Sequence, residues 1–312
     1  MSADRKPLYS YWAPQYWPIW FWLALLRLVC LLPHKIALAA GRVVGRLAHR
    51  FAHSRRAVVR RNIELCFPEL TPGDRDALAY KHFLAIGMMV IETGLGRWAS
   101  DAHLSSITRI VGTEHLQRAV DSGRGVILLS AHFTTLEISG RVLALHSPPF
   151  DGVYRKNPSD FITELQRSGR ERSVAVTIEK RELKKIIRSL RDGRPVWYAP
   201  DQSYSRKGSV LIEFFGIPTM HTTATSTLAR LGRAVTIPFF PSRLEDDSYL
   251  LTLLPPLENF PSDDPIEDTR RYVALLEEHI RTCPEQYFWM HRKFKNLPDN
   301  YPDYYSDLAA SK

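Results

Sequence analysis

The chain has 312 residues, of which 45% are hydrophobic, so it is long enough to bury a sizeable core in one large domain or two small ones. Its cysteines, Cys30, Cys66 and Cys283, lack the spacing of a disulfide framework or a zinc site, which indicates a reducing compartment. Residues 5–63 hold eleven of the 42 Lys and Arg residues and none of the 33 Asp and Glu residues, so the net charge of +9 is concentrated there. Such a block attracts nucleic acid or an anionic membrane surface.

Aromatic residues crowd the N-terminus and lead into an apolar run from Tyr16 to Leu32, which contains Arg27 and ends at Pro33. Tryptophan and tyrosine side chains favour the lipid headgroup level. A helix over these 17 residues would be about 25 Å long, slightly shorter than a hydrocarbon core of about 30 Å. The run is compatible with a helix that spans the membrane, a helix inserted in its interface, or an ordinary buried helix.

The next segment alternates apolar and basic positions at helical spacing. The apolar positions are Ile36, Ala40, Val43, Val44, Leu47, Phe51 and Ala52, and the basic ones are Arg42, Arg46, His49, Arg50 and His53. This pattern indicates a basic amphipathic helix lying on anionic lipid, the alternative being a solvated helix packed on the core. Nucleic acid is not expected, because a groove binder does not need the tryptophan-rich run. We therefore expect membrane lipids as partners, with residues 1–62 as a membrane anchor and basic amphipathic helix and residues 63–312 as the domain that follows it.

The rest of the chain predicts a long helix over 71–98, starting at Thr71-Pro72, and then an alternation of strands and helices. Strands are predicted at 126–131, 153–154, 174–178, 195–199, 234–240 and 249–254. Helices are predicted at 137–145, 159–170, 181–191, 222–231 and 266–281. This order predicts an α/β fold with a mostly parallel central sheet flanked by helices, preceded by the N-terminal membrane-associated helical segment.

A histidine lies where a buried strand ends, since His132 directly follows the apolar run 126–131. Ligands of open α/β sheets bind outside the carboxyl ends of the strands. Glu137 follows five residues later and meets His132 if the histidine precedes a helix whose first turn holds the glutamate. An imidazole can then take a proton from a hydroxyl while the carboxylate fixes its tautomer. The alternative is a partly buried histidine hydrogen-bonded to a glutamate that the helix dipole favours.

Charged groups follow several other predicted strands or helices. Arg155 closes the strand 153–154, Asp201 follows the strand 195–199, and Arg170 with Arg172 precedes the strand 174–178. Each alone is compatible with a solvated charge. Together they could place positive charge at the mouth of one crevice, where an oxyanion or phosphate groups would be stabilised.

Several stretches, in this order along almost the entire chain, carry a family resemblance. They are Arg61-Asn62-Ile63-Glu64-Leu65-Cys66-Phe67-Pro68, His132 to Glu137, Gly152-Val153-Tyr154-Arg155, Val196-Trp197-Tyr198-Ala199-Pro200-Asp201 and Pro284-Glu285-Gln286-Tyr287-Phe288-Trp289-Met290-His291-Arg292. The chain resembles the late lipid A acyltransferases of Gram-negative bacteria, in the lauroyl/myristoyl branch of the lysophospholipid acyltransferase superfamily. It is most similar to the lauroyl-transferring members. The superfamily motif is a histidine, four residues and an acid, and here the acid is Glu137 instead of the commoner aspartate.

The resemblance implies an O-acyltransferase that moves a fatty acyl chain, lauroyl in the most similar members, from acyl carrier protein to a hydroxyl of the Kdo-bearing precursor Kdo2-lipid IVA. It also implies the cytoplasmic face of the bacterial inner membrane, with a single-pass or deeply inserted N-terminal helix. By position, His132 would be the general base and Glu137 its orienting partner. Arg170 and Asp201 would organise the oxyanion or acceptor site, and Arg155 would bind phosphate or donor. No metal or other cofactor is expected, because the carrier-protein thioester is the donor substrate.

Three other functions remain as alternatives. One is a coenzyme A-dependent acyltransferase that acts on lysophospholipid or glycolipid. Another is a serine hydrolase that uses Ser130, although Leu129-Ser130-Ala131 lacks the glycines of a nucleophile elbow. The third is a non-catalytic protein that binds membranes or nucleic acid.

Overall fold

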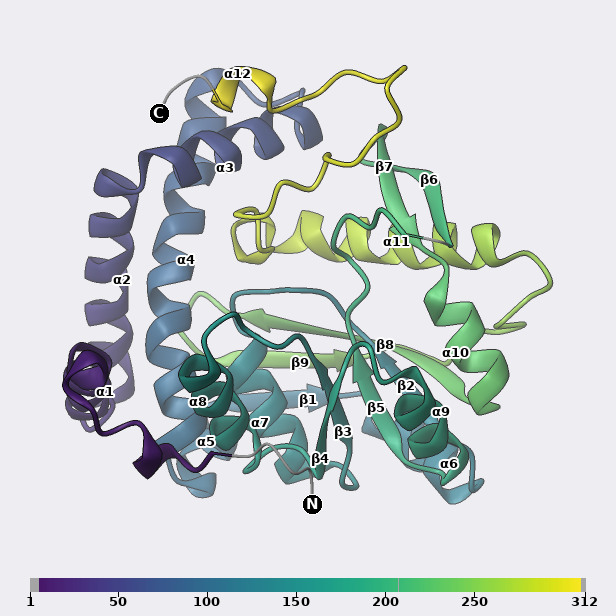
Figure 1. Cartoon of the computed structure of the whole chain (residues 1–312), viewed down its shortest axis with the longest axis horizontal. Helices are drawn as coiled ribbons and strands as arrows, with labels where there is room; N and C mark the ends of the chain where they lie inside the picture. The colour runs from purple at the N-terminus through teal and green to yellow at the C-terminus, as the bar shows by residue number, and fades with distance from the viewer. Residues whose placement is uncertain (1–5, 207, 310–312) are drawn as a thin grey trace.

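The computed structural model describes residues 6–206 and 208–309. Its centre is a seven-stranded sheet in the order β1-β9-β8-β2-β5-β3-β4 (Figure 1). The strands are β1 (Thr108–Val111), β2 (Val126–Leu129), β3 (Asp151–Tyr154), β4 (Val176–Glu179), β5 (Pro195–Tyr198), β8 (Val235–Arg243) and β9 (Tyr249–Leu253). In this sheet, neighbouring strands run parallel except β8 and β9, which are antiparallel. The predicted α/β fold with a mostly parallel sheet is confirmed.

All the strands predicted from the sequence are present, but β1 and a separate hairpin were not predicted. The hairpin consists of β6 (Ser209–Phe214) and β7 (Ile217–Thr222), which pair antiparallel. Its turn residues Phe215 and Gly216 both have positive φ, 52° and 73°. An aromatic residue is uncommon in that conformation, so the sequence lacks the Asn-Gly or Asp-Gly signal that marks most tight hairpins.

Helices pack on both faces of the sheet and along one side of it (Figure 1). The longer ones are α1 (Trp17–Val29), α2 (His34–Phe51), α3 (His53–Cys66), α4 (Pro72–Trp98), α6 (Thr113–Asp121), α7 (Leu136–His146), α8 (Asp160–Arg170), α9 (Leu183–Arg191), α10 (Ala224–Gly232) and α11 (Pro265–Thr282). Short elements are α5 (Asp101–Ser106), α12 (Ser306–Ala309), η1 (Leu8–Ser10), η2 (Pro14–Tyr16) and η3 (Pro284–Gln286). The predicted start of α4 is confirmed, since the Thr71 hydroxyl accepts the Asp74 N–H at 3.2 Å.

Strand β2 is buried along its whole length, as its apolar sequence predicts. Val126 and Leu128 face a core shared with α4, α6 and α7, whereas Ile127 and Leu129 face a second core shared with α9, α10 and α11. This alternation follows from the two-residue period of a strand. Because both faces of β2 are packed, the position of its carboxyl end is fixed. The segment that follows β2 therefore begins at a fixed position.

Helix α1 is shorter than the apolar run from Tyr16 to Leu32 in which it lies. Helix α1 covers 13 residues, which corresponds to about 20 Å, and the chain turns at Cys30 before α2 begins. Across residues 6–206 and 208–309, the structure contains no helix with the length and apolar character needed to cross a membrane. Arg27 lies beside the Trp98 ring, with its guanidinium carbon 5.5 Å from the ring centre.

Helix α2 packs on α4 through small residues and leaves its predicted apolar stripe exposed. Its buried residues are Ala37, Leu38, Gly41 and Gly45, and a Cβ at Gly87 of α4 would overlap the backbones of Gly41 and Gly45. The exposed large apolar side chains of α1, α2 and their flanks are Tyr9, Trp12, Trp17, Phe21, Trp22, Leu25, Leu28, Leu31, Leu32, Ile36, Val43, Val44, Leu47 and Phe51. We call these residues the N-terminal apolar face. Helix α2 therefore does pack on the core, through this glycine-containing face, while the large apolar side chains of the predicted stripe are exposed.

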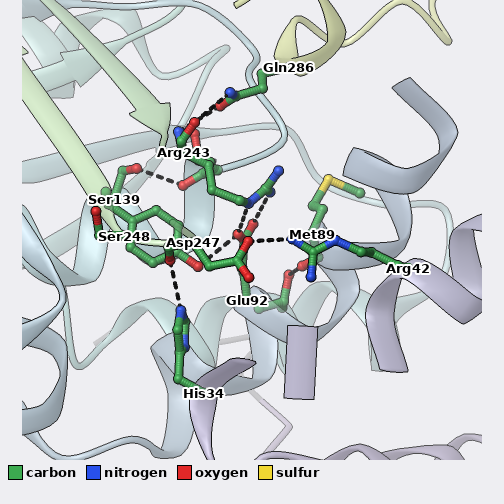
Figure 2. A network of polar contacts seen from close by, with 12 residues as sticks. His34, Arg42, Met89, Glu92, Ser139, Arg243, Asp247, Ser248 and Gln286 are labelled. Carbon is green, nitrogen blue, oxygen red and sulfur yellow. Dashed lines mark hydrogen bonds and ion pairs between the residues drawn. The ribbon is translucent and has the colours of Figure 1, made fainter. Parts of the chain in front are cut away.

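A buried polar network joins α4 to the β8–β9 hairpin (Figure 2). Arg243 donates to the Glu92 carboxylate at 2.6 Å and 2.8 Å, and the Tyr249 hydroxyl donates to it at 2.8 Å. Only 4% of the Arg243 side chain and 1% of the Glu92 side chain are exposed. At the tip of the hairpin, Asp247 forms an ion pair with Arg42 of α2. The network therefore fixes α2 and α4 against the antiparallel end of the sheet.

Candidate active site

Strands β2 and β5 are neighbours, and their register places His132 beside Asp201. Leu129 pairs with Tyr198, and His132 and Asp201 each lie three residues further on. The His132 ring bonds through Nδ1 to Asp201 Oδ1 at 2.6 Å, and the His132 backbone N–H donates to Asp201 Oδ2 at 3.2 Å. An ionised carboxylate only accepts hydrogen bonds, so Nδ1 carries the hydrogen. The structure thus joins a predicted histidine and a predicted strand-end carboxylate.

The other ring nitrogen of His132, Nε2, has a polar side chain beside it, and 30% of the His132 side chain is exposed. The side-chain nitrogen of Gln202 lies 3.3 Å from His132 Nε2 and 3.0 Å from His291 Nε2. Burial and then the neighbouring His132 ring lower the pKa of His291 to about 4, so His291 is neutral near pH 7. With Nδ1 bonded to Asp201, Nε2 holds the lone pair that can accept a proton.

The predicted hydrogen bond between His132 and Glu137 is not formed among the described residues, and this pairing is corrected. The Glu137 carboxylate instead accepts from Arg170 Nε at 3.1 Å and 3.2 Å and forms an ion pair with its Nη2. Glu137 lies in the first turn of α7 and Arg170 is the last residue of α8. The strand register places Asp201 beside His132. Glu137 pairs instead with Arg170 of the neighbouring helix α8.

The Glu137–Arg170 pair is half-buried and charged. Burial lowers the pKa of Arg170, but the Glu137 carboxylate outweighs burial and leaves this pKa above its ordinary value. A guanidinium presents donors in a fixed planar fork, and the carboxylate occupies one edge of it. Arg170 and Glu137 were both predicted as site residues, and the structure brings them together in this ion pair.

Asp201 is held by groups that the sequence did not single out. The Tyr287 hydroxyl donates to Asp201 Oδ2 at 3.2 Å, and the Lys293 ammonium donates to the Asp201 backbone carbonyl. Burial raises the pKa of Asp201, but His132 and then Lys293 lower it below its ordinary value. Burial in turn lowers the pKa of Lys293 to about 8. Asp201 is therefore an ionised, immobilised acceptor for His132.

Gln202, Tyr287, His291 and Lys293 are the site residues that sequence reasoning missed. Gln202 directly follows Asp201, and Tyr287 and His291 belong to one of the family-like stretches. The signal was therefore present as a motif. The sequence did not reveal the β-bridge between Phe133 and Tyr287, which brings this C-terminal segment next to the end of β2.

Arg155 lies away from this pair, in a cluster of exposed cations. Strand β3 pairs with β4 so that Tyr154 faces Glu179, which places Arg155 and Lys180 side by side at the carboxyl ends of the two strands. Burial and then the cations of Arg155, Arg206 and Arg181 lower the pKa of Lys180. Among the described residues, Arg155 forms no ion pair or side-chain hydrogen bond. The cluster is therefore a surface of net positive charge, only partly offset by Glu179, at the same sheet edge as His132.

Ser130 does not have the surroundings of a nucleophile. Its side chain is fully buried, and its hydroxyl has no hydrogen-bond partner among the described residues. Its backbone carbonyl accepts the Tyr272 hydroxyl at 2.8 Å. A hydroxyl that is not bonded to the histidine and not accessible argues against the serine hydrolase alternative.

Comparison with known proteins gives a consistent family match. A family model described as bacterial lipid A biosynthesis acyltransferase matches residues 5–296. The chain is 38% identical over 295 residues to the lipid A biosynthesis lauroyltransferase of Escherichia coli (strain K12), covering 94% of this chain and 96% of that protein. It is 35% identical over 288 residues to the lipid A biosynthesis palmitoleoyltransferase of the same strain, covering 91% and 93%.

A relative from another genus and one solved structure extend the comparison. The chain is 33% identical over 306 residues to a lipid A biosynthesis acyltransferase of Haemophilus influenzae (strain ATCC 51907 / DSM 11121 / KW20 / Rd), covering 96% of this chain and 97% of that protein. The crystal structure of the 1-acyl-sn-glycerophosphate acyltransferase from Thermotoga maritima is 12% identical, with a TM-score of 0.37 over 79% of this chain and 97% of that chain.

Proposed function

Because the chain belongs to the bacterial lipid A biosynthesis acyltransferase family, we propose that it moves a lauroyl chain from acyl carrier protein to a hydroxyl of Kdo2-lipid IVA. The observation that carries the chemistry is the 2.6 Å bond between His132 Nδ1 and Asp201. It sets the tautomer in which Nε2 carries the lone pair that acts as a base, in a side chain that is 30% exposed. The nucleophile is then the substrate's own hydroxyl, so no serine or cysteine of the protein is required.

The reaction proceeds by attack of the acceptor hydroxyl on the thioester carbonyl. His132 Nε2 takes the hydroxyl proton while the new C–O bond forms, and Asp201 stabilises the resulting imidazolium. The tetrahedral intermediate then collapses, the C–S bond breaks, and the imidazolium returns the proton to the departing thiolate. The products are the ester and the free thiol of the carrier protein, so no proton is gained or lost overall.

Arg170 stabilises the oxyanion of that intermediate, and Glu137 orients Arg170. This assignment replaces the earlier expectation that Glu137 orients His132. Its support is the ion pair, which holds the guanidinium at the start of α7, four to five residues beyond His132. A charged donor that is already fixed in place needs no reorganisation when negative charge develops.

The cation cluster around Arg155 and Lys180 binds anionic groups of the substrates. Strand β3 is two strands away from β2, which is about 10 Å at the usual strand spacing. That separation places the cluster beside the reacting groups without direct contact to His132. Four crowded cations repel one another, and a phosphate group of the acceptor or donor would relieve that repulsion.

The N-terminal apolar face lies in the membrane interface, with the catalytic residues on the cytoplasmic side of the inner membrane. Lys35, Arg46 and Arg50 are exposed on α2 beside the apolar side chains. Apolar side chains flanked by cations match the acyl chains and anionic headgroups of a bilayer surface.

Replacing Trp22, an exposed residue of this face, with glutamate is expected to weaken binding to anionic vesicles about tenfold or more. The change removes one large apolar group from lipid, adds a negative charge, and leaves every contact of the core intact. Vesicle flotation measures the effect. Leu183→Glu, at an exposed apolar position on α9, is the matched control and should bind normally. Equal binding of both variants and the unaltered protein would refute the assignment.

The proposed reaction is tested by offering two donors to two acceptors. Lauroyl carrier protein and lauroyl coenzyme A are each combined with Kdo2-lipid IVA and with lysophosphatidic acid, and products are identified by mass spectrometry. We expect the added lauroyl mass mainly on Kdo2-lipid IVA with the carrier-protein donor. Preferential acylation of lysophosphatidic acid from coenzyme A would favour the alternative acyltransferase and reject our substrate assignment.

A further inference from the structure

Three aromatic rings from the N-terminal segment surround one side chain of α8. The Tyr11 ring stacks on Phe161, with ring centres 4.9 Å apart. The rings of Tyr16 and Trp20 approach Phe161 to 5.1 Å and 5.4 Å, and the Trp20 indole N–H donates to the Tyr11 carbonyl at 2.8 Å. Tyr11 and Phe161 are buried. We call Tyr11, Tyr16 and Trp20 the aromatic clamp.

The clamp and the active site lie at opposite ends of α8. Phe161 is the second residue of this helix, and Arg170, which pairs with Glu137, is the last. Within α8, Phe161 and Glu164 are the buried residues. The middle of the helix is tied to α4, because Arg97 donates to the Leu165 carbonyl at 3.2 Å and to the Ser168 hydroxyl at 3.1 Å. Loss of the clamp would therefore free the start of α8 to tilt about this central attachment.

A small tilt is sufficient to disturb the ion pair. Arg170 lies five residues beyond Leu165, or about 7.5 Å along the helix axis. A rotation of about 10° about Leu165 would move Arg170 by about 1 Å, which lengthens its hydrogen bonds to Glu137 beyond good geometry. Displacements of about 1 Å in a catalytic constellation can lower the rate by up to about a hundredfold.

We propose that the aromatic clamp is a positioning element of the active site, which holds α8 so that Arg170 meets Glu137 in the catalytic arrangement. The inference rests on the proposed function, specifically on the role of Arg170 in oxyanion stabilisation. It gives the N-terminal segment a second task besides membrane contact. The rings that pack on Phe161 point into the protein, whereas Trp12, Trp17 and Trp22 of the same segment are exposed.

The test compares Tyr11→Ala with Tyr11→Phe and with Leu183→Ala in the full chain. Assays use detergent micelles, saturating acceptor and varied concentrations of lauroyl carrier protein, so that kcat and KM are both obtained and vesicle binding does not limit the rate. Tyr11→Ala is expected to lower kcat about tenfold with little change in the KM for lauroyl carrier protein, because orientation of Arg170 affects the transition state more than donor binding. Tyr11→Phe retains the stacked ring and should restore kcat. Leu183→Ala removes an apolar side chain on α9 that is 50% exposed and lies outside both the clamp and the N-terminal apolar face, so it should be neutral.

A double-mutant cycle and hydrogen exchange separate positioning from general destabilisation. In an Arg170→Gln background, Tyr11→Ala should lower kcat less than twofold, because the group it positions is gone. Tyr11→Ala should also speed exchange of the α8 amides at 160–170 and leave the α9 amides at 183–191 unchanged. Additive losses or unchanged α8 exchange would overturn the clamp. Full activity of Arg170→Gln alone would instead reject the proposed role of Arg170, and with it the route by which the clamp acts.

Discussion

Replacing Asp201 with asparagine is expected to lower the rate of acyl transfer about a thousandfold while the protein stays folded. The His132 backbone N–H and the Tyr287 hydroxyl both donate to Asp201 Oδ2, so the asparagine oxygen would remain at that position. The amide nitrogen would then face His132 Nδ1 and donate to it. Nδ1 would lose its hydrogen, Nε2 would gain one, and the imidazole could no longer accept the proton of the acceptor hydroxyl.

The effect is measured as kcat for transfer from lauroyl carrier protein, with thermal unfolding as the check on folding. Asp192→Asn, at an exposed position beyond α9, is the control for the chemical change itself and should retain full activity. Glu137→Gln should lower kcat through Arg170, without the change of tautomer. An Asp201→Asn variant that is folded and within tenfold of normal activity would show that the histidine does not depend on this carboxylate.

Replacing Glu92 with alanine is expected to lower the free energy of unfolding by about 3–5 kcal/mol. The change would leave the Arg243 guanidinium buried without its carboxylate, and the Tyr249 hydroxyl would lose its acceptor as well (Figure 2). Burial penalises an unpaired charge far more than it penalises the pair. Because the network joins α4 to β8 and β9, the loss should appear in the global unfolding transition.

Denaturant unfolding in detergent provides the measurement, and Glu267→Ala is the matched control. Glu267 pairs with Arg270 at 2.8 Å on α11, where both side chains are more than half exposed, so its removal should change stability by less than about 1 kcal/mol. Replacing both residues of the buried pair with apolar ones, Glu92→Leu together with Arg243→Met, should recover most of the free energy of unfolding that Glu92→Ala loses. Equal stability of Glu92→Ala and Glu267→Ala would contradict the importance assigned to the buried network.

Much of the fold was predictable because the strongest signals are local. The apolar run 126–131 marked β2, and Thr71-Pro72 marked the start of α4. On α2, the apolar stripe was expected to face away from the core, but the face that packs on α4 was not predicted, because Gly41 and Gly45 carry no hydrophobic signal. The short edge strand β1 and the Phe215-Gly216 turn lacked the patterns on which strand prediction depends.

The residues of the candidate site were easier to select from the sequence than the contacts between them. His132, Glu137, Arg170 and Asp201 were all selected, yet His132 pairs with Asp201 instead of the expected Glu137, and Glu137 pairs with Arg170. The contact of His132 with Asp201 depends on the register between two strands about seventy residues apart, which spacing along one segment does not encode. Lys293 and His291 reach Asp201 and Gln202 only because the C-terminal segment folds back to β2.

The most direct test of the account is a single-turnover measurement with His132→Ala. The purified variant, in excess over Kdo2-lipid IVA, is mixed with lauroyl carrier protein, and the lauroylated product is followed by mass spectrometry. Loss of the general base should slow product formation by about 10³-fold or more, without a change in thermal stability large enough to explain it. Product formation within tenfold of the unaltered protein would contradict the central claim that the His132 imidazole takes the proton of the acceptor hydroxyl.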